Sequence, residues 1–237
     1  MFAALPLASL FLLATPGAPV AYPNLGALID KVGTQLEAQV GATLQGAQTL
    51  RVRKEELDSD GKVSDVSEEL LRAKGEGEAL EFELIHATEN GKDVTAERLA
   101  ERADSKTKGG TAKGHHGDHD IRDINPFTQR AKYRYWVVGP LPPAGQPVHV
   151  HFEPGVEPVP ELVTGDALVD PVTGNLLQAT FAPSALPMMV QTLKLKVVMG
   201  TVGKAPGATE VSVDGRGGLL FWHKHFRVHL WFTPKAS

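Results

Sequence analysis

The chain has 237 residues, of which 42% are hydrophobic and 22% charged, and its formal net charge is −4. This length and apolar share fit one β-rich domain or two small ones, and the negative charge argues against a nucleic-acid-binding protein. The absence of cysteine excludes disulfides, thiol nucleophiles, iron–sulfur clusters, cysteine-ligated zinc and a cysteine-linked lipid anchor.

Residues 1–21 have the layout of a secretory signal peptide. Leu5 to Ala14 form an apolar, uncharged run, and the small residues after it place Ala18 or Ala21 before a cleavage point. One feature of signal peptides is missing, because no Lys or Arg precedes the run. The alternative to a signal peptide is a buried N-terminal strand or helix. The run is too short to span a bilayer, and no later segment is long and apolar enough. The sequence therefore predicts an exported protein, periplasmic or secreted, with a single domain at 22–237.

The segment Asn24 to Gln45 is predicted to form a helix with one apolar stripe. The apolar residues recur at three- and four-residue steps, at Leu25, Leu28, Ile29, Val32, Leu36, Val40 and Leu44. Asn24 can cap the first turn. Three glycines weaken the helix by roughly 1 kcal/mol each relative to alanine, so we expect the stripe to pack on a sheet.

Strand and turn patterns follow the helix. Leu50 to Lys54 and Leu80 to His86 contain alternating apolar and polar residues, which predicts strands. Asp58 to Lys62 is typical of a hairpin turn; a calcium loop is the alternative, but its further acidic ligands are missing. Glu89 to Lys92 contains an Asn-Gly turn. Thr95 to Ala103 is predicted to be a short helix that Thr95 caps.

The segment 103–123 is nearly free of apolar residues and rich in Gly, Lys and Asp, so we predict a flexible, solvated loop. It contains His115, His116 and His119 beside two aspartates, a composition that can bind zinc, nickel or copper. The spacing matches no structured zinc site, and binding would have to order a glycine-flanked loop. A solvated polar loop with incidental metal affinity is therefore the alternative interpretation.

From Lys132 onward, short segments alternate between apolar and polar residues and are separated by Gly- and Pro-rich turns. The strand segments are Lys132 to Val137, Val148 to Glu153, Ala167 to Val169, Leu176 to Phe181, Leu193 to Met199 and Trp222 to Phe232. Turns are predicted at Asp170 to Asn175 and at Asp214 to Gly218. This pattern predicts a mainly β (α+β) fold, an antiparallel meander curled as an open half-barrel and covered by the N-terminal helix.

Five histidines lie on the polar sides of two predicted strands. His149 and His151 share one side of their strand, and His223, His225 and His229 share one side of theirs. If the two strands are neighbours, up to five imidazoles meet and form a metal site or a patch that gains charge below about pH 6.5. The alternative is ordinary filling of a polar sheet face.

No catalytic frame was found in the sequence. There is no Gly-x-Ser-x-Gly elbow, His-Glu-x-x-His, P-loop or dinucleotide fingerprint. The large Met and aromatic side chains can line an apolar ligand cavity or can form ordinary core. We therefore expect a protein that is not an enzyme and carries no cofactor.

One stretch carries a family resemblance. Gly165 to Leu176, a strand with an aspartate that ends in a turn, is followed by Ala182 to Pro187. Together with the order of signal peptide, long helix and amphipathic strands, it resembles the Lol-type periplasmic lipoprotein carriers and their lipoprotein-sorting relatives. The resemblance implies a half-open β-barrel curled over helices that binds acyl chains or lipoprotein tails. The polar insertion at 103–123 departs from the compact carriers, and no functional residue is carried over.

Three functions remain open at this point. The first is an envelope protein that holds a lipid or lipoprotein acyl chain in a hollow between helix and sheet. The second is a metal-binding periplasmic protein that uses His115, His116 and His119. The third is a structural or interaction module without a small ligand.

Overall fold

The computed structural model describes residues 22–74, 81–107, 125–202, 205–219 and 222–234. The helices in these ranges are α1 (Leu25–Gly46), α2 (Thr95–Thr107) and the 3-10 helix η2 (Arg130–Lys132). The strands are β1 (Ala47–Leu57), β2 (Val63–Lys74), β3 (Glu81–Glu89), β4 (Lys92–Asp93), β5 (Tyr133–Val137), β6 (Val148–Pro154), β7 (Val163–Val169), β8 (Leu176–Pro183), β9 (Val190–Val202), β10 (Ala205–Leu219) and β11 (Trp222–Pro234).

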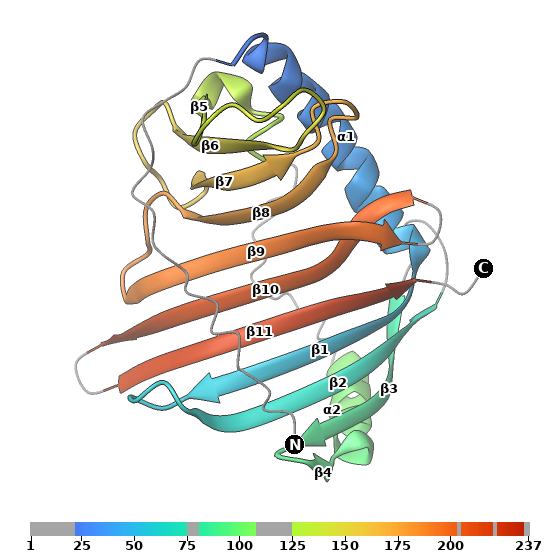
Figure 1. Cartoon of the computed structure of the whole chain (residues 1–237). Helices are drawn as coiled ribbons and strands as arrows, with labels where there is room; N and C mark the ends of the chain where they lie inside the picture. Colours follow the sequence, from blue (N-terminus) through green and yellow to red (C-terminus); the bar gives the residue numbers. More distant parts are fainter. Residues whose placement is uncertain (1–21, 75–80, 108–124, 203–204, 220–221, 235–237) are drawn as a thin grey trace, which may run out of the picture.

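All these strands belong to one open antiparallel sheet (Figure 1). Their order is β4-β3-β2-β1-β11-β10-β9-β8-β7-β6-β5, so every two neighbouring strands are consecutive in the chain except β1 and β11. That pairing joins the two ends of the chain in the middle of the sheet and leaves β4 and β5 at its edges. The predicted fold class, mainly β with an open antiparallel sheet and an N-terminal helix packed on it, is confirmed.

Both α-helices lie on the same side of the sheet, which we call the helix face; the opposite side is the polar face. Under α1, Leu28, Ile29 and Val32 pack with buried residues of β5 to β8. Near α2, a smaller cluster contains Leu71, Leu84 and Ala87, with Val94 packed against it. Helix α1 therefore packs on one end of the apolar side of the sheet, and α2 lies beside β3 near the other end.

Two buried polar side chains fix α1 over the strands. Gln39 donates from Nε2 to the carbonyl of Leu176 (3.1 Å) and accepts from the Leu176 amide (3.1 Å). Thr43 accepts from the Ala208 amide (2.6 Å) and donates to the Gln39 carbonyl (2.8 Å). These bonds satisfy backbone groups of β8 and β10 that would otherwise be buried without a partner, which sets the position of the helix.

The predicted helix caps are wrong in detail. Asn24 precedes α1 with φ 60°, in the left-handed region, and its side chain makes no capping bond. Thr95 is the first residue of α2, but its hydroxyl accepts from the Ala87 amide of β3 (2.9 Å). The side chain of Asp93 instead accepts from the Thr95 amide (2.8 Å). At Asn24 the left-handed backbone conformation overrides the local capping preference. At Thr95 the hydrogen bond to β3 overrides it.

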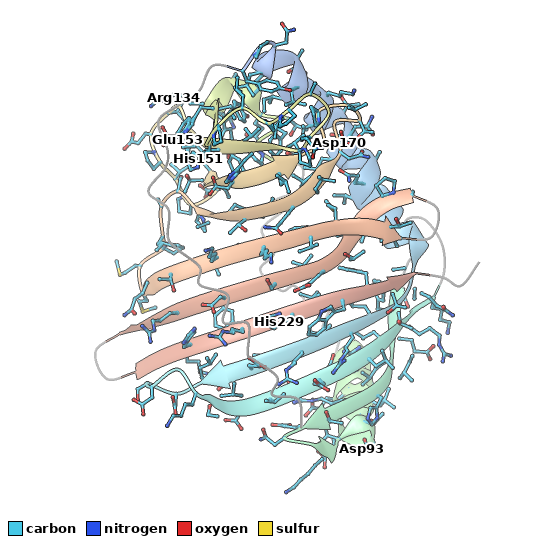
Figure 2. All side chains as sticks on the ribbon, in the orientation of Figure 1. Asp93, Arg134, His151, Glu153, Asp170 and His229 are labelled. Atoms are coloured by element: carbon cyan, nitrogen blue, oxygen red, sulfur yellow. The ribbon has the colours of Figure 1, made fainter. Side chains whose placement is uncertain are left out.

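Three predicted turns are confirmed. In the Asp58 to Lys62 hairpin turn, the Asp58 side chain accepts from two backbone amides and Gly61 has φ 78°. Asn90 and Gly91 both have positive φ, as their hairpin turn requires. Asp170 accepts from the amides of the turn between β7 and β8 (Figure 2).

The turn predicted at Asp214 to Gly218 is wrong, because these residues continue β10 and pair with both β9 and β11. Glycine occurs there for a packing reason. A Cβ atom on Gly215 would lie 2.4 Å from Cζ of Phe226, its partner on β11. The absence of a side chain at Gly215 makes room for the aromatic ring of the neighbouring strand.

Three parts of the predicted domain organisation can be compared with the described residues. Strand β2 was not predicted, because its run of Ser, Asp and Glu hides the alternation. Residues 103–107 of the predicted loop are the last residues of α2. The rest of that loop and the predicted signal peptide at 1–21 lie outside the described residues.

The Gly215→Ala variant should be less stable than the wild type by about 1–3 kcal/mol, because the new methyl group meets the Phe226 ring. Gly41→Ala is the matched control, since nothing lies within 4 Å of its added Cβ and alanine favours the helix by roughly 1 kcal/mol. Urea unfolding measures both. Equal stability of Gly215→Ala and wild type would contradict the packing explanation.

Replacing Gln39 with leucine should lower the free energy of unfolding by about 1–3 kcal/mol, because the amide and carbonyl of Leu176 lose their partner in a buried place. Gln48→Leu, at an exposed position of β1, should change stability by less than about 0.5 kcal/mol. Thermal and urea unfolding of the two variants provide the comparison; a Gln39→Leu protein as stable as Gln48→Leu would rule out this role of Gln39.

Candidate functional site

Between the two helix-covered ends, the helix face carries a strip of nine apolar side chains that we call the central apolar strip. Its members are Leu193, Leu195, Val197, Val211, Val213, Phe226, Val228, Leu230 and Phe232. All nine are half-buried, and none belongs to either of the buried clusters associated with the helices. The middle of the sheet is therefore apolar but not covered like its ends.

Strand register produces the strip. Val197 of β9 pairs with Val211 of β10, which pairs with Leu230 of β11. One step along, Leu195, Val213 and Val228 form the next row. Because successive side chains alternate between the faces, the six side chains of these two rows all lie on the helix face.

The strip ends in charged residues at the end of the sheet where β1 leads into β2. Beyond Phe226 and Val228, the same face carries Lys224 of β11 and Lys54 and Glu56 of β1. The Glu56 carboxylate Oε1 lies 3.8 Å from Lys54 Nζ and 3.5 Å from Lys224 Nζ. Two ammonium groups thus share one carboxylate at this end.

The space between α1 and β5 to β8 is filled. Ile29 and Val32 of the helix are 1% and 0% exposed, and Val148 and Val150 of the sheet are both 0% exposed. The hollow expected between helix and sheet is therefore occupied by side chains in this half of the molecule. The residues of the central apolar strip are not packed in this way.

Two shallow clefts lie away from the strip. One, of about 260 Å³, is lined by Tyr22, Pro23, Pro171 and residues from 141 to 148. The other, of about 370 Å³, is lined by Gln129, Lys132 and residues from 156 to 162. Neither is lined by a residue of the central apolar strip, and both are at the small end of the range for ligand pockets.

On the polar face, two aspartates each hold basic side chains together. Asp166 Oδ1 lies 3.0 Å from His151 Nδ1 and 3.4 Å from His149 Nε2. Hydrogen bonds from His149 and then His151 lower the pKa of Asp166, against the opposing effect of partial burial. Trp136 packs on the His151 ring with centroids 4.5 Å apart.

The second aspartate, Asp214 of β10, is bonded to residues of β11. It lies 3.2 Å from His225 Nε2 and 2.9 Å from Arg227 Nε. Sequence reasoning placed the histidines on polar strand faces but missed both aspartates. The signal that identifies them is the cross-strand register, which pairs Asp166 with His151 and Asp214 with Arg227.

The histidines of β6 and those of β11 do not come together. Strands β7, β8, β9 and β10 lie between β6, which carries His149 and His151, and β11. Figure 2 shows His151 near one end of the sheet and His229 on β11. The hypothesis of a five-imidazole site is therefore wrong, because it required β6 and β11 to be neighbours.

The other metal prediction concerns His115, His116 and His119, which lie outside the described residues. Among the residues that the structure does describe, no group of three His, Asp or Glu side chains is arranged to hold a metal ion. Metal binding by these three histidines therefore stays a prediction.

The comparisons with known proteins assign this chain to no family. No family model matches the chain, and no curated protein does. A chain of the Pseudomonas aeruginosa MucA/MucB complex is 13% identical, with 87% of this chain and 99% of that chain covered and a TM-score of 0.24. A structure of MucB in complex with MucA(peri) gives the same identity and coverage and a TM-score of 0.22. Likeness at this level decides neither the family nor the function of this chain.

Within the described ranges, neither helix has the length and hydropathy needed to cross a bilayer.

Asp166→Asn should reduce stability at pH 5 by less than about 1 kcal/mol, because the Asp166 side chain is 46% exposed and its ion pairs are partly screened. The folded pKa lies below the unfolded value, so the carboxylate stabilises the fold above about pH 4, and this contribution disappears as the pH falls through the folded pKa. The difference between variant and wild type should therefore be smaller at pH 3 than at pH 5.

Urea unfolding at the two pH values measures this effect. Glu161→Gln is a matched change at an exposed carboxylate for which no ion pair was found. A difference between Asp166→Asn and wild type that is unchanged from pH 5 to pH 3 would show that the charge of Asp166 is not its cause.

Proposed function

We propose that this protein binds an apolar chain, such as the acyl chain of a lipid or lipoprotein, on the central apolar strip. The single observation that carries the proposal is the set of three strands whose apolar side chains lie in register, half-buried, between the two buried clusters. A sheet face of this kind gains free energy when an apolar partner removes it from water.

The dimensions of the strip suit an acyl chain. Phe226 to Phe232 spans six residue steps of β11, or roughly 20 Å at about 3.4 Å per residue. One leaflet of a bilayer is about 15 Å of hydrocarbon, half of the ~30 Å core. Each methylene removed from water contributes about 0.8 kcal/mol, so even partial coverage of the chain gives useful affinity.

The setting of this activity is part of the same proposal. The signal-peptide pattern at 1–21 supports an exported protein in the periplasm or outside the cell. The lack of catalytic sequence motifs supports a binding role without catalysis. In the structure, the closely packed contact between α1 and β5 to β8 supports a rigid frame beside the strip.

Binding of a neutral naphthylamine dye, whose fluorescence rises in apolar surroundings, tests the proposal. The purified wild-type protein should enhance the fluorescence, and Val213→Asp should weaken binding about tenfold or more, because the new carboxylate must be desolvated (tenfold corresponds to ~1.4 kcal/mol). Ser212→Asp is the matched control, since Ser212 is next to Val213 on β10 but faces the other side.

Circular dichroism and thermal unfolding show whether both variants are folded. The dye should bind the Ser212→Asp protein as it binds wild type. No dye binding by wild type, or equal binding by the two folded variants, would remove the strip as the site and leave an interaction module without a small ligand.

A further inference from the structure

Three connections between strands lie at the same end of the sheet, which we call the loop end. They are the β6–β7 loop (155–162), the β8–β9 loop (184–189) and the β1–β2 turn (58–62). Strand register places them at one end. The first residue of β7 pairs with the last of β8, and the first residue of β9 pairs with Gly217, close to the end of β10. The last residue of β1 pairs with His225, close to the start of β11. In Figure 1 the β8–β9 loop and the β1–β2 turn lie on the left side of the sheet.

Exposed apolar side chains gather at the loop end. In the described part of the chain, ten large apolar side chains are exposed, and six of them belong to these connections or to the residue that follows the β1–β2 turn. The most exposed is Met188, at 89%, and its neighbour Met189 is 52% exposed. A single exposed apolar residue needs no explanation, but a group of them at one end is typical of an interaction surface. The six residues are Val63, Val156, Val159, Leu186, Met188 and Met189.

The backbone of the β8–β9 loop is strained where it presents these side chains. Met189 has φ 77°, in the left-handed region that a residue with a bulky side chain rarely adopts. Its carbonyl accepts a hydrogen bond from the Gly218 amide of β10 (2.8 Å). On the other side, the Ser184 hydroxyl donates to the Val159 carbonyl (2.9 Å), which joins the β8–β9 loop to the β6–β7 loop. Strain that leaves a methionine in water adds nothing to the core, and such strain is found at functional sites.

A lipid bilayer suits this surface better than a folded protein does. We propose that the loop end docks on a bilayer and inserts its apolar side chains between the lipid head groups. From β7 to β1 the loop end extends over five strand spacings, roughly 24 Å, with polar residues such as Glu157 and Asp60 between the apolar ones. A protein partner must pack closely against about 20–30 residues. The head-group region of a fluid bilayer receives separate apolar side chains without a matching shape.

Charged side chains of both signs surround the apolar ones. Lys194 and Arg216 are exposed on the polar face near this end, and Glu157 and Glu161 are exposed on the β6–β7 loop. Zwitterionic head groups also present both signs, so the mixture is complementary to a phosphatidylcholine surface. The net charge of −4 gives the chain no general attraction to an anionic membrane. The expected partner is therefore a zwitterionic bilayer, and binding depends on the insertion of apolar side chains. This inference goes beyond the proposed function and does not rest on it.

Flotation with phosphatidylcholine vesicles in a density gradient tests the inference. Wild type should float with the vesicles, and Leu186→Gln/Met188→Gln should lower the partition coefficient about tenfold or more, because two polar side chains resist insertion (tenfold corresponds to ~1.4 kcal/mol). Leu141→Gln/Val172→Gln is the matched control, since both residues are exposed, at 46% and 64%, in connections at the opposite end of the sheet. The control should float as wild type does.

The comparison isolates the loop end. Glutamine leaves the net charge unchanged in both double variants. All the proteins share residues 1–21, so any contribution of the apolar run in that segment is common to them. Circular dichroism and thermal unfolding show whether the variants are folded.

Insertion can also be observed directly, because the chain has no cysteine. Met188→Cys and Val172→Cys each accept a single nitrobenzoxadiazole label, whose fluorescence rises when it leaves water. Addition of vesicles should raise the emission of the label at position 188 about twofold or more and leave the label at position 172 nearly unchanged.

The outcomes separate this inference from the proposed function. Absence of wild-type flotation overturns the inference and leaves a protein as the partner of the loop end. Equal loss of flotation in the two double variants, or an equal response of the two labels, also overturns it, because binding would then have no preference for this end. Dye binding without flotation removes only the bilayer site, and flotation without dye binding removes only the acyl-chain site on the central apolar strip.

Discussion

The register of the strands is the constraint on which the molecule depends. Ten strand pairs keep side chains of one kind on one side of the sheet. A slip of one residue in any pair would move its apolar side chains to the other face. The pairing of β1 with β11 is the most demanding of these, because it joins segments that are far apart in the sequence, and the charged end of the strip depends on it.

The apolar side of the sheet is covered unevenly, and the proposed binding site depends on this. Helix α1 is fixed to β8 and β10 by Gln39 and Thr43, and it fills the space above β5 to β8. The cluster near α2 covers residues of β2 and β3. What remains is the middle of the sheet, where β9, β10 and β11 present apolar rows that belong to neither cluster.

Sequence patterns predicted what depends on neighbours along the chain. Alternation predicted the late strands, and Asn-Gly and Asp-rich segments predicted hairpin turns that the structure confirms. Sequence patterns failed where a distant residue decides the local structure. Gly215 was predicted in a turn, but it lies in a strand, where the Phe226 ring of β11 packs over it. Thr95 accepts a hydrogen bond from β3 instead of capping its own helix. The charged end of the candidate site could not be predicted from the sequence for the same reason. Lys54 and Lys224 are far apart in the sequence and share Glu56 only through the pairing of β1 with β11.

The two faces of the sheet differ in whether their side chains already have partners. On the polar face, Asp166 holds two histidines, Asp214 holds His225 and Arg227, and Glu68 of β2 accepts from Arg51 and Arg53 of β1. These carboxylates gain little from a further ligand, because their hydrogen bonds are made within the chain. On the helix face, apolar side chains that are only half-buried gain free energy from any partner that removes them from water, at about 25 cal/mol per Å². The side of the sheet that gains most from a partner is therefore its apolar side, which is the reason for proposing the binding function there.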